Sequence, residues 1–303
     1  GHYYLADETV DIGANHITVG TANGQTLCIN LNGKTLTGGN ANGIFSMRTC
    51  TLNVMGDGNV TGGSSASRVF NTNGGTINLY GGTYGVASGR VVWTENVGTV
   101  TLHEGTIDGT NGAFAVYLNK GGSFIMNGGT VAGTRVYSDN VGNVTNTITI
   151  NGGTITGGLG TKLCNLTVTG GTINTLDVGE DTAATLSGKP VIAAMNVADG
   201  VKVTVGTLET GASIKVNANG VFTEDFADAD AATAAMTFFS AVDAETKEIK
   251  VNDKALECVA KATTPDLPDP TLSIYEQAKA MNFTGTLPTY CPACGATEGV
   301  TWT

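Results

Sequence analysis

The stretch Ile148-Thr-Ile-Asn-Gly-Gly-Thr-Ile-Thr-Gly-Gly158 reads as a short strand, a glycine corner, a second short strand and another glycine corner. Apolar and polar residues alternate in its first half, so Ile148 and Ile150 are expected to point inward and Asn151 outward. Glycine supplies the positive φ and the close backbone approach that a tight corner needs. Related copies occur as Leu31-Asn-Gly-Lys-Thr-Leu-Thr-Gly-Gly39, Leu79-Tyr-Gly-Gly-Thr-Tyr-Gly85, Leu102-His-Glu-Gly-Thr-Ile-Asp-Gly109, Met126-Asn-Gly-Gly-Thr-Val-Ala-Gly133 and Val168-Thr-Gly-Gly-Thr-Ile-Asn174.

The copies recur at a narrow period, which is typical of a solenoid. The apolar residues that follow successive corners lie 24, 24, 23, 24, 24, 18 and 18 residues apart, at Leu36, Val60, Tyr84, Ile107, Val131, Ile155, Ile173 and Val191. A leucine-rich repeat has a similar length, but its Leu/Asn consensus and its helical half are missing. Because each period instead contains short β-runs separated by Gly, Asn or Asp, we predict an all-β fold. It is a single-stranded parallel β-helix whose coils taper from ~24 to ~18 residues.

Changes in composition divide the chain into three predicted segments. Residues 1–222 form the β-helix, and its first coil, 1–24, is atypical because a terminal coil has to cover an open ladder edge. Residues 223–262 read as a small α/β cap, with a helix within 225–239 and a hairpin over 242–251. Residues 263–303 read as a proline-containing linker, a short helix over 273–281 and a Cys-x-x-Cys segment that joins a next module.

The composition also excludes some classes of function. The formal net charge is −11 with only 15 Lys and Arg residues, so the basic stripe of a nucleic-acid-binding protein is not expected. No run of 18 consecutive apolar residues is present, so no membrane span is expected in this segment. The 44 Gly residues come with only 6 Pro, which argues against both collagen and a disordered linker.

An enzyme on this fold, such as a polysaccharide lyase or hydrolase, needs clustered carboxylates for acid–base work or for a cation. The acids of the regular coils scatter over different phases of the repeat, and we interpret them as solvated turn residues: Asp57, Glu95, Glu104, Asp108 and Asp139. No catalytic residue is therefore expected in these coils.

An aromatic column is the sharpest candidate for a binding surface. Aligning the third run of successive coils places five aromatic residues in register, at Phe45, Phe70, Trp93, Tyr117 and Tyr137. Each follows an aliphatic residue suited to the core, namely Ile44, Val69, Val92, Val116 and Val136. The pleat then predicts an outward aromatic stripe that binds sugars or docks another protein. The alternative has the aromatics inward or covered by the C-terminal segment.

The run Cys291-Pro-Ala-Cys-Gly295 is half of a zinc site, since a zinc site needs four ligands. Cys258 is a candidate third ligand, and His2 or His16 of a neighbouring copy is a candidate fourth. A local disulfide between Cys291 and Cys294, or free thiols, are equally open alternatives. No other cofactor is expected. Cys50 and Cys164 fall on apolar phases of their strands and are expected to be small core residues.

The two ends of the chain carry a family resemblance. The end Cys-Pro-Ala-Cys-Gly-Ala-Thr-Glu-Gly-Val-Thr-Trp-Thr303 and the start Gly1-His-Tyr-Tyr-Leu-Ala resemble module borders of large tandem-repeat, secreted or surface β-helix proteins of Gram-positive anaerobic bacteria. In those adhesin-like proteins the first motif directly precedes the second, and a β-helix with similar glycine corners follows. The resemblance covers most of the chain and implies one period of a tandem array in an extracellular setting. It brings no catalytic residues.

Together these observations favour a non-enzymatic extracellular module, structural or adhesive, that stacks or links head to tail as a stalk, an adhesin or a filament subunit. Its expected partners are neighbouring copies of itself, and glycans or a host surface. The alternative is a carbohydrate-binding module that uses the aromatic column. A polysaccharide lyase or hydrolase is the third hypothesis.

Overall fold

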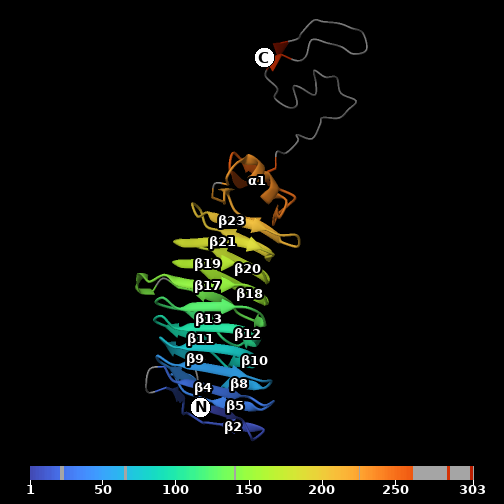
Figure 1. Cartoon of the computed structure of the whole chain (residues 1–303). Coiled ribbons are helices and arrows are strands. Elements are labelled where there is room, and N and C mark those ends of the chain that lie inside the picture. The colour runs from blue at the N-terminus through green and yellow to red at the C-terminus, as the bar shows by residue number, and fades with distance from the viewer. Residues whose placement is uncertain are drawn as a thin grey trace. The chain divides into compact units, whose positions relative to one another are not determined.

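The computed structural model describes residues 1–20, 24–64, 67–139, 141–224 and 226–261, and the backbone of 285–286 and 301–302. The chain forms two compact units, Gly1–Ala260 and Lys261–Thr303. The first unit is an all-β parallel solenoid whose strands stack in layers from β2 to β23, with a single helix, α1, beyond the last layer (Figure 1). The predicted fold class is thus confirmed.

Coils in the first half of the solenoid have three faces. Their strands are β1 (His2–Tyr4), β2 (Thr9–Asp11), β3 (Ile17–Val19), β4 (Thr26–Asn30), β5 (Thr35–Gly38), β6 (Phe45–Met47), β7 (Thr51–Met55), β8 (Asn59–Gly62), β9 (Arg68–Asn73), β10 (Thr76–Val86), β11 (Arg90–Glu95), β12 (Thr99–Asp108), β13 (Phe114–Leu118), β14 (Ser123–Met126), β15 (Thr130–Ala132) and β16 (Val136–Ser138), followed by a short 3-10 turn, η1 (Val141–Asn143). The strands β10 and β12 each run across the first two faces without a break.

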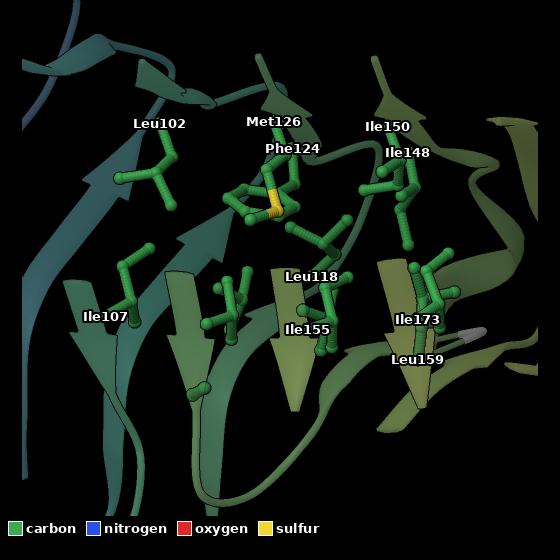
Figure 2. Close-up of a cluster of buried hydrophobic side chains, with 14 of the residues drawn as sticks. Leu102, Ile107, Leu118, Phe124, Met126, Ile148, Ile150, Ile155, Leu159 and Ile173 are labelled. Atoms are coloured by element: carbon green, nitrogen blue, oxygen red, sulfur yellow. The ribbon is translucent and has the colours of Figure 1, made fainter. Parts of the chain in front are cut away.

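Every face is a parallel ladder whose backbone hydrogen bonds run from one coil to the next. On the first face they include Thr51 N to Gln25 O, Thr76 N to Cys50 O and Thr99 N to Gly75 O, at 2.8, 2.8 and 2.9 Å. The alternation predicted around Ile148 is confirmed. Ile148 and Ile150 are buried, and they meet apolar side chains of the opposite face, including Ile155 and Ile173, inside the solenoid (Figure 2).

The second half of the solenoid has narrower coils. Its strands are β17 (Asn146–Ile150), β18 (Thr154–Thr161), β19 (Cys164–Val168), β20 (Thr172–Val178), β21 (Thr182–Gly188), β22 (Val191–Val197), β23 (Val203–Leu208) and β24 (Ser213–Asn217). The strand β18 pairs with β15 through Ile155 and with β16 through Leu159, so one strand takes the place of two. The loss of that corner explains the shortening to 18 residues between Ile155 and Ile173.

The last apolar residue of the predicted repeat series, Val191, is wrong by one residue. Ile173 pairs with Ile192, which is 1% exposed, whereas Val191 pairs with Thr172 and is 37% exposed. The corner before it is Gly188-Lys-Pro190 rather than Gly-Gly-Thr, and the different corner shifts the phase of the pleat by one residue. The next partner after Ile192 is Ile214, so the coils lengthen again toward the cap.

A small cap covers the last coil. It contains β25 (Gly220–Val221), α1 (Ala229–Met236), β26 (Phe239–Ala241), β27 (Lys247–Asn252) and β28 (Ala255–Ala260). The Asp228 carboxylate accepts a hydrogen bond from Ala231 N (2.8 Å) and fixes the start of α1. The ring centroids of Phe222 and Phe239 lie 5.7 Å apart, and both side chains belong to the apolar core of the solenoid. The cap therefore shares that core.

The cap hairpin lies later in the chain than predicted. It is formed by β27 and β28, and β28 also pairs with β25. The predicted hairpin turn does form a tight turn, but in the described part of the chain the strands on its two sides, β26 and β27, are not paired with each other. In this turn the Asp243 carboxylate accepts hydrogen bonds from Glu245 N and Thr246 N, both at 3.3 Å. In the second unit the described backbone is a pair of antiparallel strands, β29 (Gly285–Thr286) and β30 (Thr301–Trp302). The predicted helix at 273–281 lies outside the described residues.

Candidate functional site

The predicted aromatic column is in fact two columns. Phe45 pairs with Phe70, but Phe70 pairs with Val92, and Trp93 pairs with Asn71. Phe45 and Phe70 are 0% exposed, so the prediction that they point outward is wrong. Their rings stack 5.5 Å apart inside the solenoid.

The change of register between Phe70 and Trp93 has a local cause. Val69 and Phe70 are both buried inside β9, as are Val91 and Val92 inside β11. The register between these strands is irregular there, since it pairs Arg68 with Arg90 and Phe70 with Val92 and omits the valines between them. A strict two-residue alternation therefore fails at this point. The predicted inward positions Ile44, Val69, Val92, Val116 and Val136 are all buried, as expected.

Trp93, Tyr117 and Tyr137 do form an outer row, since each pairs with the next across successive coils. They belong to a larger surface, the aromatic–arginine patch, which we define as Arg68, Arg90, Trp93, Phe114, Tyr117, Arg135 and Tyr137. Arg68 pairs with Arg90, and Arg90 with Phe114, so the cations lie in a second row beside the first. The outer row ends at Gly160, which pairs with Tyr137 and has no side chain.

The rings of the patch are in contact but do not form a flat platform. The ring centroids of Trp93 and Tyr117 lie 5.9 Å apart with planes inclined at 70°, and those of Tyr117 and Tyr137 lie 6.1 Å apart at 37°. Phe114 stacks on Tyr137 at 5.5 Å and 24°. Trp93, Phe114 and Tyr137 are half-buried, whereas Tyr117 is 9% exposed. The arrangement is an aromatic cluster with partly accessible rings.

Guanidinium groups lie over these rings. The Arg68 Cζ atom is 3.9 Å from the Trp93 ring centroid, and the Arg90 Cζ atom is 4.4 Å from the same centroid and 4.5 Å from that of Tyr117. The Arg135 Cζ atom is 5.1 Å from the Tyr137 centroid. Contacts of this kind are cation–π interactions, which hold a guanidinium group beside an aromatic ring.

Two carboxylates partly balance the charge of the patch. Arg68 Nη1 lies 3.9 Å from Glu95 Oε1. Burial lowers the pKa of Arg68, Glu95 opposes this change, and the nearby Arg90 adds to it. The Tyr117 hydroxyl donates a hydrogen bond to Asp139, and burial together with this hydrogen bond raises the pKa of Tyr117 to about 12. Tyr117 therefore stays a neutral hydrogen-bond donor through the physiological pH range.

Several polar atoms of this face lack a hydrogen-bond partner among the described residues. They are the donors Arg90 Nε and Trp93 Nε1, the acceptor Asn71 Oδ1, which belongs to the residue paired with Trp93, and the acceptor Asn119 Oδ1, two residues beyond Tyr117. Unpaired buried polar atoms are uncommon in folded proteins, and each one costs free energy. Their concentration here marks the patch as a surface whose polar groups the fold itself does not satisfy.

The first coil is a second candidate surface. In the part of the chain that the structure describes, β1, β2 and β3 each pair on one side alone, with β4, β5 and β6. A hollow of about 730 Å³ opens there and is lined mainly by apolar side chains, including Val10, Ile12 and Ile17. Tyr3 and Tyr4 are 63% and 71% exposed. The first coil was predicted to cover its ladder edge, and none of the described residues does so.

Two of the acids come closer together than the sequence indicated. Asp57 and Glu104 line one polar groove of about 660 Å³, because the glycine corners of their coils stack and Glu104 pairs with Tyr80 of the coil between them. Both carboxylates are exposed, so the groove lacks the buried setting in which an enzyme holds a general acid. Tyr80 stacks on His103 at the same corner, with centroids 4.4 Å apart.

The other acids have individual roles. Glu95 and Asp139 belong to the contacts of the patch, and Asp108 accepts a hydrogen bond from Thr110 N (2.9 Å) in a turn. Within the described ranges no three His, Cys, Asp or Glu residues lie close enough to hold a metal ion.

The cysteines of the solenoid are core residues. Cys50 and Cys164 are buried free thiols, as predicted, and burial raises the pKa of Cys164 to about 11. Cys258 is also a free thiol, 1% exposed, inside the cap. Cys291 and Cys294, the proposed half of a zinc site or disulfide, lie outside the described residues.

Sequence reasoning missed Phe114 and the three arginines of the patch. A signal was present, since the dipeptide Arg-Val occurs at 68–69, 90–91 and 135–136, each time at the start of the third face. No helix among the described residues is long and apolar enough to cross a membrane. No protein family, curated protein or solved structure matches this chain.

Proposed function

We propose that the chain is a non-enzymatic structural and adhesive module that joins a neighbouring copy through its first coil. One observation carries this proposal: the two ends of the solenoid differ. The last coil is covered by the cap, whereas among the described residues β1, β2 and β3 present unpaired ladder edges around an apolar hollow. Exposed ladder edges are templates for the addition of further strands.

A second copy is the occupant that fits this end best. Three short edges face the same way around one hollow, so the matching surface must offer backbone groups on three sides together with apolar side chains at its centre. A small molecule fills the hollow without pairing the edges, and a single peptide strand pairs one edge. A region of another β-solenoid module that presents ladder edges and an apolar centre of its own meets both requirements.

The border motifs support an extracellular setting for this module. They resemble the junctions of tandem arrays in secreted and surface proteins, and a rigid solenoid that links to its neighbours gives length to a stalk or a filament. We therefore place the protein outside the cell, in contact with neighbouring copies and with a host or glycan surface.

Substituting Val10 by lysine is expected to weaken self-association at least about tenfold, because it places a charge in the hollow that the neighbour would cover. Sedimentation velocity over a concentration series measures this change. Val191→Lys is the matched control, since Val191 lies on the outer side of β22. A wild-type protein that stays monomeric throughout, or equal behaviour of the two variants, contradicts the proposal.

A carbohydrate-binding role is the second candidate. It is favoured by the outward, half-buried rings of Trp93, Phe114 and Tyr137, which lie beside the guanidinium groups of Arg90 and Arg135. Aromatic faces with adjacent polar groups suit the apolar faces and hydroxyl groups of sugars.

On a glycan array, Trp93→Ala is expected to reduce binding at least about tenfold relative to wild type, the typical effect of losing a central aromatic anchor. Tyr80→Ala removes an exposed aromatic residue outside the patch and is expected to leave binding unchanged. If the wild type binds no glycan on the array, the carbohydrate-binding role is wrong. If Tyr80→Ala alone loses binding, the sugar binds in the groove beside Tyr80 and not at the patch.

A further inference from the structure

We propose that the aromatic–arginine patch binds acidic polysaccharides, in which carboxylate or sulfate groups recur along the chain. This inference rests on the carbohydrate-binding role proposed above and adds the chemical class of the ligand.

The distribution of arginine is the first observation. The chain has four arginines in 303 residues and a formal net charge of −11, yet Arg68, Arg90 and Arg135 all lie on the patch. The fourth, Arg48, is exposed and is not part of the patch. A protein that needed only solubility or packing at this face has no reason to gather its few guanidinium groups there, because like charges repel one another.

The contacts of these arginines are the second observation. The Cζ atom of each of these arginines lies within 3.9 to 5.1 Å of an aromatic ring centroid, so each guanidinium is held at the patch by a ring and carries N–H donors for a ligand. These donors form a planar fork that matches the two oxygens of a carboxylate or a sulfate. Because the rings already contact cations, the patch is better suited to an anionic sugar than to a neutral sugar stacked on a bare ring.

The balance of charges and donors is the third observation. Glu95 lies beside Arg68, and Asp139 accepts a hydrogen bond from Tyr117, but no carboxylate pairs with Arg90 or Arg135 among the described residues. A ligand that brings negative acceptor groups complements this surface.

The repeat of the solenoid favours a polysaccharide over an acidic peptide. Arg68 and Arg90 pair across adjacent coils, which lie about 4.8 Å apart in a β-ladder. Arg135 lies two coils beyond Arg90, with the coil of Phe114 between them, so cations recur along the solenoid at intervals of one and two coils, beside half-buried rings. A polymer that repeats both an anion and an apolar sugar face matches this order.

The test uses the full chain and pairs of polymers that differ in charge. Binding is measured to polygalacturonate and to its methyl ester, to dextran sulfate and to dextran, and to polyglutamate as the peptide arm. The variants are Arg90→Gln with Arg135→Gln, Arg135→Gln alone, and Arg48→Gln as a control that removes the same charge outside the patch. Circular dichroism checks the fold, and the exposed Arg135 keeps the test valid if the double variant is unstable.

We expect binding to at least one of the two acidic polysaccharides, little to their neutral counterparts, and at least a tenfold weaker affinity in the double variant, with Arg48→Gln unchanged. Binding to polygalacturonate indicates a carboxylate ligand, and binding to dextran sulfate indicates a sulfate ligand. Equal binding to neutral polymers with no effect of Arg135→Gln overturns the inference but leaves the carbohydrate-binding role intact. Equal loss in Arg48→Gln, or polyglutamate binding as tight as that of the polysaccharides, also overturns the inference. Absence of binding to every sugar polymer overturns both.

Discussion

Substituting Phe70 by alanine is expected to lower the free energy of unfolding by about 3–5 kcal/mol, the usual cost of removing a fully buried phenylalanine. Phe70 is 0% exposed, and its ring lies 5.5 Å from that of Phe45 and 5.2 Å from that of Tyr84. The substitution leaves a cavity between two aromatic neighbours held by the stacked coils, so the site cannot collapse to fill it. Denaturant titration followed by circular dichroism measures the change.

Tyr80→Ala is the matched control for this prediction. Tyr80 is 44% exposed and stacks on His103 at the outer surface, so its loss is expected to cost about 1 kcal/mol or less. If Phe70→Ala were as mild as Tyr80→Ala, the inward placement of Phe70 would be wrong, and the single outward column would be correct after all.

Substituting Gly133 by alanine is expected to lower the free energy of unfolding by about 2–5 kcal/mol, through two causes. The residue has φ of +79°, which an L-residue adopts at a cost of about 1–2 kcal/mol. A Cβ atom would also lie 2.3 Å from Thr110 N and 2.5 Å from Thr110 Cα, backbone atoms of the preceding coil. Relieving this contact means separating two coils, a strain of about 1–3 kcal/mol.

Gly200→Ala separates the two causes. Gly200 has φ of +78°, and no atom lies within 4 Å of the position its Cβ would take. It should therefore show the conformational cost alone, and a thermal or denaturant transition should move less than in Gly133→Ala. Equal shifts in the two variants would show that the stacking of coils at the Gly133 corner is looser than the structure describes.

The sequence alone was enough to predict the solenoid, because its signals are periodic and redundant. The positions Leu36, Val60, Tyr84, Ile107 and Val131 each follow a glycine corner, and all pair across successive coils in the predicted register. A mistake at one corner leaves the others unaffected, so an average over many corners gives the fold. The shortening after Ile155 was readable for the same reason.

Details within a single coil were not predictable from a two-residue alternation. Where a strand is irregular, two successive residues are buried, as at Val69 and Phe70, and the count of inward and outward residues then shifts by one. Trp93 therefore lies outside although Phe70 lies inside. A shift by one residue also occurs at the corner that contains Pro190. There the residue that pairs with Ile173 is Ile192 and not the predicted Val191.

Of the seven residues of the aromatic–arginine patch, three were found from the sequence and four were missed. Alignment of apolar residues brings Trp93, Tyr117 and Tyr137 together, but it carries no information on what lies beside them. The arginines occur one position before a valine in three coils, and the structure was needed to show that their side chains reach the rings of Trp93, Tyr117 and Tyr137. The groove that Asp57 and Glu104 line together was missed likewise.

The direction of the ladder hydrogen bonds has a mechanical consequence. Because the bonds from Thr51 N, Thr76 N and Thr99 N to the preceding coils run along the solenoid, tension between its two ends acts on them directly. Such a load separates one coil from the next, and each detached coil of 24 residues releases roughly 80 Å of extended chain. For the 18-residue coil between Ile155 and Ile173 the step falls to roughly 60 Å. Under load the solenoid would thus lengthen in steps whose size reports which coil has opened.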